Sequence, residues 1–317
     1  MDRTKFEPYP AGARAPESTL MAVGQPHILV LTLHTDEPQL GRCVEVIRAQ
    51  EDVIVEHQII SGLGNTEAHQ ALYETVESRA SEFDLFVKVD ADMVLANAAV
   101  LARIGGLFGA DPELDHAQLA IEDFYTDHRI MGLHAFSPRV RWPRVDEGLF
   151  VDPMPRVPGR RAALWEPSAT VAFHSPDPSP LQAFRFGLHR ASKAFQPGRK
   201  RFRGSQAHEQ WQTLGRTWDA FIRHGDLARG LATYGADLIW RGAIALDGEG
   251  YQSAKIDCAF DEAPNDPRLL LEALEARWRP SVGRAVRHMR SLGPKRTARM
   301  LGASARQQLQ FTQGRRK

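Results

Sequence analysis

The sequence has few cysteines and no long hydrophobic run, and each absence excludes a class of protein. Cys43 and Cys258 are the only cysteines in 317 residues, so neither a disulfide framework nor a cysteine zinc site can form. No apolar run approaches the roughly 20 residues of a membrane-spanning helix. Residues 1–26 lack the hydrophobic segment of a signal peptide. We therefore expect a cytoplasmic protein.

Acidic residues are missing from the C-terminal end, although the whole chain carries a net charge of only +1. Residues 277–317 hold 12 Lys and Arg and no Asp or Glu, whereas residues 1–100 hold 16 acidic and 7 basic residues. This asymmetry predicts an anionic partner for the C-terminal part. Apolar residues between the arginines suit an amphipathic helix lying on an anionic membrane, or equally a helix packed on the core.

Strand-like and helix-like segments alternate in the first half of the chain. Apolar runs predict strands over residues 27–33 and 53–60, and helical spacing of apolar residues predicts helices over 40–50 and 68–76. This order predicts right-handed βαβ units on a parallel sheet. Beyond residue 180 the pattern is helical, over residues 181–195, 207–224, 227–241 and 267–278. We expect a flexible arm (1–25), an α/β domain (26–180) and a helical region with a basic tail (181–317).

The most informative stretch is Asp84 to Met93, which reads Asp-Leu-Phe-Val-Lys-Val-Asp-Ala-Asp-Met. A short strand buried on both faces would end in Asp90 and Asp92. Two carboxylates this close raise each other's pKa unless a cation lies between them. A hard divalent cation carrying a phosphorylated ligand is one occupant, and a polar strand end that caps the next helix is the alternative.

Four landmarks in order resemble a known family. A strand runs into the polar loop His34-Thr35-Asp36-Glu37, a helix follows from Leu40, a strand ends in Lys88-Val-Asp-Ala-Asp92, and a last strand ends in His174. Residues 27–176 thereby resemble GT-A-type glycosyltransferases of the large family 2 group. The resemblance implies an α/β GT-A (Rossmann-like) fold, a mainly parallel sheet flanked by helices, here followed by a helical C-terminal region.

The resemblance also implies a site at which a divalent metal, Mn²⁺ or Mg²⁺, holds a nucleotide-sugar donor. It assigns the metal to Asp90, Asp92 and His174. For His174 the alternative is a histidine at a strand end that is hydrogen-bonded to the backbone. The donor contacts it assigns, several of which could instead be helix caps or plain ion pairs, are His34, Thr35, Glu37, Ser61, Lys88 and Asp90. Ser61 stands where the family often has an acidic residue that contacts the base.

An inverting transfer needs a carboxylate that takes the proton of the acceptor hydroxyl. By resemblance this base is Asp152, whose usual acidic neighbour is replaced by Val151, and Glu147 is the second candidate. Both lie in a proline-rich segment that predicts a loop. Glu122 and Asp123 are a third possibility, in a predicted acidic turn.

These features predict a metal-dependent glycosyltransferase of the hexosyltransferase type that uses a nucleotide-sugar donor. Its acceptor would be a glycan or lipid-linked molecule in cell-surface polysaccharide biosynthesis, with a peripheral contact at the inner membrane face through the basic tail. One alternative is a sugar-phosphate nucleotidyltransferase, although residues 34–38 lack the Gly-rich basic loop expected of one. Another is a degenerate nucleotide- or membrane-binding protein. We expect no nucleic-acid partner.

Overall fold

The computed structural model describes residues 7–8, 24–144, 155–164, 169–196, 202–244, 253–279 and 281–314. The chain divides into two compact units. The first, here called the sheet unit, comprises residues 1–124 and 128–177. The second, here called the helical unit, comprises residues 178–317 together with the short turn Tyr125–Asp127.

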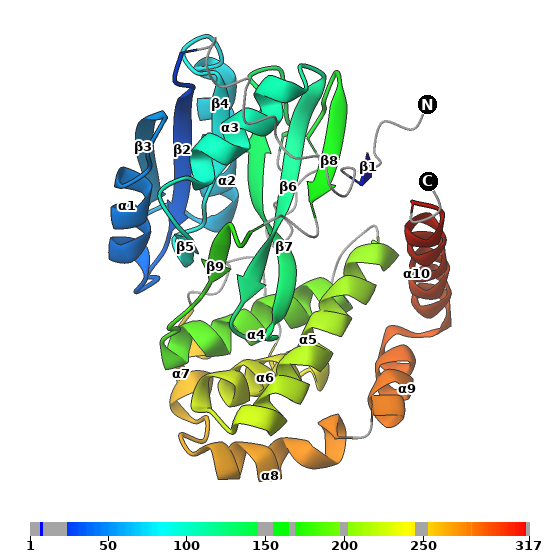
Figure 1. Ribbon diagram of the computed structural model, residues 1–317. Helices are drawn as coiled ribbons and strands as arrows, with labels where there is room; N and C mark the ends of the chain where they lie inside the picture. The colour runs from blue at the N-terminus through cyan, green and yellow to red at the C-terminus, as the bar shows by residue number, and fades with distance from the viewer. Residues whose placement is uncertain are drawn as a thin grey trace. The chain divides into compact units, whose positions relative to one another are not determined.

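The sheet unit carries all the described strands and three helices (Figure 1). The helices are α1 (Leu40–Arg48), α2 (Asn65–Ser78) and α3 (Val100–Ala110). The strands are β1 (Glu7–Pro8), β2 (His27–His34), β3 (Ile54–Ser61), β4 (Leu85–Lys88), β5 (Met93–Leu95), β6 (Leu114–Asp123), β7 (His128–Phe136), β8 (Arg160–Leu164) and β9 (Ala172–His174).

The described strands form one mixed sheet in the order β1-β8-β6-β7-β4-β2-β3, with β9 joining β6 to β5. Strands β3, β2 and β4 are parallel, as the βαβ pattern predicts. Strand β7 runs antiparallel to both β4 and β6. The predicted α/β class is confirmed, and the antiparallel β7 makes the sheet mixed.

Alternate residues of the central strands enter two different hydrophobic cores, because successive side chains of a strand point to opposite faces. Ile28 and Val30 of β2 pack in a core with residues of α1 and α3. Leu29 and Leu31 pack in a second core with residues of α2. Burial on both faces explains why β2 and β4 are continuous apolar runs in the sequence.

Two local predictions are wrong. The sequence of residues 94–108 predicts one helix, but β5 occupies Met93–Leu95 and α3 begins only at Val100. Pairing of β5 with β9 outweighs the helical propensity there. Glu122 and Asp123 were expected in a turn, but they end β6, and the turn follows at residues 124–127.

Some predictions fall mainly outside the described residues. Of the predicted flexible arm, residues 1–6 and 9–23 lie outside them, while Glu7–Pro8 forms β1 and pairs with β8. Of the proline-rich loop, residues 145–154 lie outside them.

The helical unit contains α4 to α10. Four of its helices confirm the helical segments predicted from the sequence. The bounds are α4 (Pro180–Phe195), α5 (Gly204–His224), α6 (Leu227–Trp240), α7 (Ala254–Asp261), α8 (Pro267–Trp278), α9 (Ser281–Leu292) and α10 (Pro294–Gly314).

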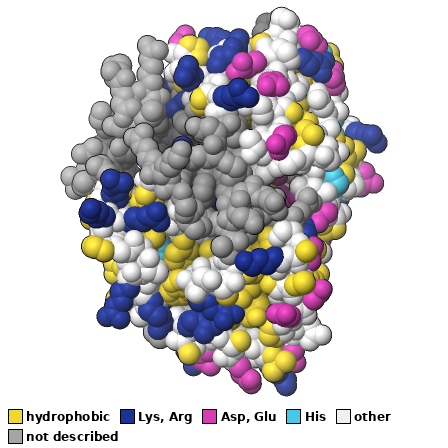
Figure 2. Space-filling view, turned by 180° about the vertical axis from the view of Figure 1, so that it is seen from behind, with side chains coloured by type: hydrophobic (Ala, Val, Ile, Leu, Met, Phe, Trp, Pro, Cys, Tyr) yellow, Lys and Arg dark blue, Asp and Glu magenta, His cyan; other side chains and the backbone are white. Residues whose placement is uncertain are grey.

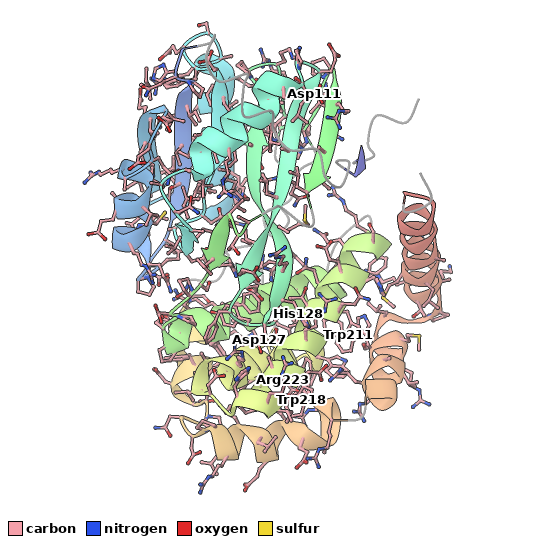
Figure 3. The ribbon with its side chains drawn as sticks, in the orientation of Figure 1. Asp111, Asp127, His128, Trp211, Trp218 and Arg223 are labelled. Atoms are coloured by element: carbon pink, nitrogen blue, oxygen red, sulfur yellow. The ribbon has the colours of Figure 1, made fainter. Side chains whose placement is uncertain are left out.

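Glycine lets α4 and α6 approach closely. A Cβ atom added at Gly187 would lie 1.8 Å from the carbonyl oxygen of Ala232, and one at Gly235 would lie 2.4 Å from that of Phe184. Neither position therefore accommodates a side chain without moving the helices apart. Four tryptophans from α5, α6 and α8 pack against one another in edge-to-face, stacked and tilted pairs, and two of them are labelled in Figure 3: Trp211, Trp218, Trp240 and Trp278.

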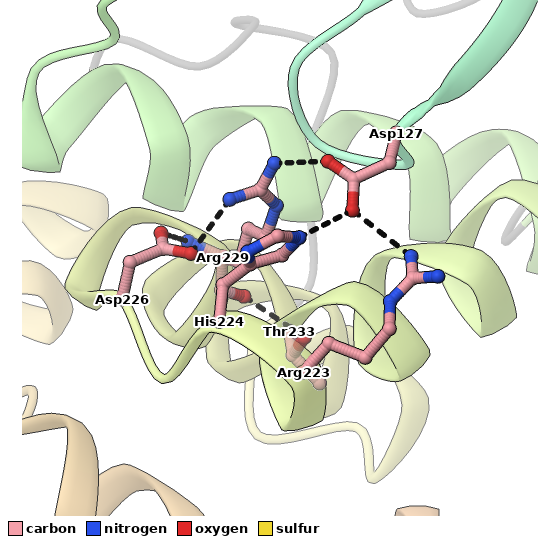
Figure 4. A network of polar contacts seen from close by, with 6 residues as sticks. All are labelled: Asp127, Arg223, His224, Asp226, Arg229 and Thr233. Atoms are coloured by element: carbon pink, nitrogen blue, oxygen red, sulfur yellow. Dashed lines mark hydrogen bonds and ion pairs between the residues drawn. The ribbon is translucent and has the colours of Figure 1, made fainter.

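The turn residue Asp127 is held by two arginines and a histidine of the helical unit (Figure 4). Its carboxylate accepts hydrogen bonds from Arg223 at 2.9 Å and His224 at 2.6 Å, and it pairs with Arg229. Arg229 is buried and also bonds Asp226, the N-cap of α6. Asp127 has a positive φ of 54°, which Asp tolerates better than most residues.

The basic C-terminal segment forms α9 and α10. His288 of α9 is fully buried, and Leu292 and Met300 pack in one hydrophobic cluster. Arg296 donates to the carbonyl oxygen of Phe195 at 3.1 Å. On the face drawn in Figure 2, Lys and Arg side chains form separate groups among apolar and acidic ones. The alternative of a helix packed on the core therefore describes α9.

Membrane-spanning helices were not expected from the sequence. Among the helices of the described residues, none is long and apolar enough to cross a membrane.

Candidate active site

Asp90 and Asp92 lie in the tight turn that follows β4 in the sheet unit. Val89 and Ala91 still donate backbone hydrogen bonds to β2, at 3.0 Å to Leu31 and 3.2 Å to Leu33. The chain is therefore extended as far as Ala91 and then turns, with the N–H of Met93 bonding the carbonyl of Asp90 at 2.8 Å. Ligands of open α/β sheets bind at this end of the parallel strands.

Asp92 meets His174, which lies 82 residues further along the chain. Strand β9 pairs with β5 so that His174 stands opposite Met93, directly after Asp92. The Nε2 atom of His174 lies 3.2 Å from Oδ2 of Asp92. Ser175 donates its hydroxyl to the same carboxylate oxygen at 2.7 Å and its N–H to the Asp92 carbonyl at 2.7 Å. These contacts fix the position of the Asp92 carboxylate.

Asp123 holds the other nitrogen of the His174 ring. Its side chain is fully buried, and its Oδ1 atom lies 2.6 Å from Nδ1 of His174. Burial by itself lowers the pKa of His174, but the charge of Asp92 and the hydrogen bond to Asp123 raise it to about 10. In the structure His174 is thus an imidazolium between two carboxylates.

Asp90 is placed differently from Asp92. Its carboxylate is one-third exposed and pairs with Lys88, whose Nζ atom lies 3.1 Å away. The two side chains therefore lie on the same face of the chain, as their spacing of two residues predicts. Predicted metal ligands Asp92 and His174 are in contact, whereas Asp90 is paired with a lysine.

The loop after β2 folds around the carboxylate of Glu37. This carboxylate accepts the N–H groups of Thr35 at 2.8 Å and Asp36 at 3.2 Å, and lies 4.0 Å from Nε2 of His34. Burial raises the pKa of Glu37; the Thr35 hydrogen bond opposes this and the charge of Asp92 adds to it. The alternative of a helix cap does not describe Thr35, because α1 begins later and Gln39 is its N-cap.

Contacts from α1 bring this loop to the segment after His174. Gln39 donates to the carbonyl of Asp177 at 2.8 Å, and Arg42 lies 3.4 Å from the Asp177 carboxylate. Ser61 is the last residue of β3 and stands beside His34 in the parallel register. The predicted donor residues of β2, β3 and β4 therefore share one end of the sheet.

A divalent metal fits this site with two protein ligands. Asp92 offers a carboxylate oxygen, and His174 offers Nε2 once the metal displaces its proton, the two atoms lying 3.2 Å apart. Asp123 orients the ring through Nδ1, as carboxylates commonly do for metal-bound histidines. Across the part of the chain that the structure describes, no group of three His, Cys, Asp or Glu side chains is placed to hold a metal. Phosphate and water oxygens would have to complete the coordination.

The predicted bases differ in whether the structure describes them. Asp152 and Glu147 lie outside the described residues. Glu122, the third possibility, accepts a hydrogen bond from Arg129 at 2.8 Å. Its neighbour Asp123 is hydrogen-bonded to His174. Sequence reasoning missed Asp123 and Ser175 as partners of the site. The acidic pair Glu122-Asp123 was a signal, but its meaning depends on the pairing of β6 with β9.

Comparison with known proteins gives little. No protein-family model and no curated protein matches the chain. One solved structure that matches is the mannosyltransferase PcManGT from Pyrobaculum calidifontis in complex with GDP-Man and Mn²⁺. It is 14% identical over 89% of this chain and 86% of that chain, with a TM-score of 0.35. A TM-score this low assigns neither fold nor activity.

Proposed function

We propose that this protein is a metal-dependent glycosyltransferase that moves a sugar from a nucleotide-sugar donor to an acceptor hydroxyl with inversion. The observation that supports this most is the contact between Asp92 and His174 at the end of the parallel strands. The carboxylate follows a buried strand, and the histidine ends a later one. Both are features of the sequence resemblance to family 2 glycosyltransferases.

Asp92 and His174 would bind the metal, and Asp90 would contact the donor ribose or a metal-bound water. A nitrogen ligand favours Mn²⁺ over Mg²⁺. The bound metal would stabilise the departing diphosphate as a Lewis acid. Asp123 would keep Nδ1 of His174 protonated, so that Nε2 remains directed at Asp92.

The donor would lie along the ends of β2, β3 and β4. His34, Thr35, Glu37 and Ser61 are proposed to contact the base and ribose, and Lys88 the phosphates. Asp152, or else Glu147, is proposed to accept the proton of the acceptor hydroxyl as it attacks the anomeric carbon. Exchange of the base for its amide should leave donor binding intact and remove turnover.

The acceptor is proposed to be a glycan or a lipid-linked molecule. A peripheral membrane contact of the basic tail belongs to the same proposal, and vesicles with and without anionic lipid would test it. The rival nucleotidyltransferase would join a nucleoside triphosphate to a sugar phosphate and release inorganic diphosphate. An assay for inorganic diphosphate therefore distinguishes it from the transferase, which releases the nucleotide.

A thermal-shift screen of nucleotides and nucleotide sugars, with and without Mn²⁺, tests the proposal. A ligand that binds the native state raises its melting temperature by mass action. We expect a nucleotide sugar to act only with the metal, and Asp92→Ala to abolish the shift. The control is Asp111→Asn. Asp111 precedes the start of β6, and Figure 3 shows it at the far end of the sheet from His128, which follows the turn at the other end of β6. An unchanged shift in Asp92→Ala, or no metal-dependent shift at all, would refute the proposal.

A further inference from the structure

Strand β3 forms one edge of the sheet of described strands (Figure 1). Within the described residues, no strand lies beyond it. The N–H of Ile54 points inward and bonds the carbonyl of Pro26 at 3.0 Å. In a parallel pair, residues alternate between pointing inward and outward. The N–H and C=O groups of Val55, His57 and Ile59 therefore point outward.

This edge lacks the features that usually prevent two sheet edges from joining. Proteins block edges with lysine, proline, bulges or very short strands. Strand β3 has eight residues, pairs with β2 without a register shift and contains no lysine or proline. Its one carboxylate, Glu56, is neutralised by Arg79 at 2.5 Å. Nothing along the strand repels a second strand.

Apolar side chains are exposed along the same edge. Ile54 is 53% exposed, Ile59 is 40% exposed, and Leu63 just beyond the strand is 49% exposed. A groove of about 400 Å³ runs between this strand and α1. Its lining combines five apolar residues with three polar ones: Val44, Ile47, Val53, Val55 and Ile59, and Arg48, Gln50 and His57. Exposed apolar surface of this kind commonly marks an interface.

The sequence of β3 is complementary to itself when two copies run antiparallel about His57. The outward groups of Val55, His57 and Ile59 then meet the same groups of the second copy, so the hydrogen bonds match. The side-chain pairs across the junction match as well: Ile54 with Ile60, Val55 with Ile59, Glu56 with Gln58, and His57 with His57. A register centred on Gln58 would instead put Glu56 opposite Ile60 and Ile54 opposite Gly62.

We propose that this protein forms a two-fold symmetric dimer in which the β3 strands pair antiparallel about His57 and join the two sheets. A second copy satisfies the outward backbone groups and extends the groove beside α1 with its own Val55 and Ile59. The interface is isologous, as in most homodimers. Each His57 keeps its hydrogen bond to Thr32, at 2.9 Å, on its own chain.

Sedimentation equilibrium of the full chain tests the dimer. We expect a mass twice the 35.4 kDa of one chain. Ile59→Lys should weaken association at least about tenfold, because it removes two symmetric apolar cross-strand pairs. Leu269→Lys, at a residue that is 51% exposed on α8, is the matched control and should leave the mass unchanged. A wild-type chain that remains monomeric would overturn the proposal and leave the edge to a strand of another protein.

Disulfide trapping tests the register without depending on that variant. In a background of Cys258→Ser, His57→Cys places two thiols directly opposite each other, with Cα atoms about 5.5 Å apart, within disulfide range. We expect a crosslinked dimer on mild oxidation. Gln58→Cys is the matched control, since residue 58 then lies opposite residue 56, and it should not crosslink. Crosslinking through residue 58 but not residue 57 would overturn the pairing.

Discussion

The Nδ1 atom of His174 lies 2.6 Å from Oδ1 of Asp123, and this contact determines which ring nitrogen faces Asp92. The two residues stand side by side because β6 and β9 pair in parallel, with Asp123 opposite His174. A fully buried carboxylate is costly unless a charged partner compensates it. The position of Asp123 is therefore explained by its role in orienting His174.

Removal of the Asp123 carboxylate should weaken the binding of the proposed metal. We expect Asp123→Asn to lower the affinity for Mn²⁺ by about 10–100-fold, the usual effect of losing a residue that orients a metal-bound histidine. Titration calorimetry with Mn²⁺ and the donor nucleotide would measure it. Glu122→Gln is the control, because Glu122 precedes Asp123 in β6 but accepts its hydrogen bond from Arg129 of β7. Equal affinities in both variants would show that Asp123 is only structural.

The two cysteines should differ in reactivity. Burial raises the pKa of Cys43 to about 12, and the nearby charges of Asp90 and Asp92 add to this, whereas Cys258 is exposed. Because the thiolate is the reactive form, we expect a thiol reagent to label one site in the native chain and two in urea. Peptide mapping should locate the native label at Cys258. Labelling of native Cys43 would contradict the packing of α1 beside the Asp90 turn.

How far the sequence predicts the structure depends on the range of the interactions. Strands β2 and β4 could be predicted because double-sided burial leaves a continuous apolar run. The positions of Asp92 and Lys88 follow from the same strand. Strand β5 could not be predicted, since Met93–Leu95 is extended only because β9 returns to pair with it.

The same limit applies within the site. His174 could be anticipated at a strand end, but its contact with Asp123 depends on a parallel pair that joins residues 51 positions apart. The Lys88 contact of Asp90 is local and follows from alternation along one strand. Assignments that rest on pairing between distant strands therefore need the structure.

Neutralisation of Asp127 should destabilise the helical unit. The buried Arg229 would lose one of its two carboxylate partners, so we expect Asp127→Asn to lower the free energy of unfolding by about 1–3 kcal/mol at pH 7. Asparagine also tolerates the positive φ of this position, so the variant should keep the backbone conformation of the wild type. Urea denaturation would measure the difference, with Asp84→Asn as a control in the sheet unit.

The effect of Asp127 should depend on pH in a defined direction. Partial burial raises the pKa of Asp127, but the His224 hydrogen bond and the charges of Arg229, His224 and Arg223 outweigh it and hold the pKa below its ordinary value. Its contribution is complete above the unfolded pKa, about 3.9, and is lost as pH falls through the lower native pKa. The two proteins should therefore converge once the pH lies below the native pKa of Asp127. A difference that persists there would assign the effect to something other than charge.

His288 should limit stability in acid. Its ring is fully buried and stacked on Trp211 at 3.9 Å, and neither ring nitrogen has a hydrogen-bond partner among the described residues. Burial, with a smaller effect of His208, lowers its pKa to about 3. Between pH 6.5 and pH 3 the unfolded chain binds a proton at this residue that the native chain does not, so stability falls as pH falls.

Replacement of His288 by phenylalanine should remove this dependence while keeping an aromatic ring against Trp211. Between pH 7.5 and pH 5 the wild type should lose about 2 kcal/mol of unfolding free energy that His288→Phe keeps. The figure follows from about 1.4 kcal/mol for each pH unit below the ordinary histidine pKa. Urea denaturation at the two pH values would measure it. Any packing difference between the rings is common to both pH values and cancels. A variant whose stability runs parallel to the wild type would mean that native His288 binds a proton readily, and that its surroundings open in acid.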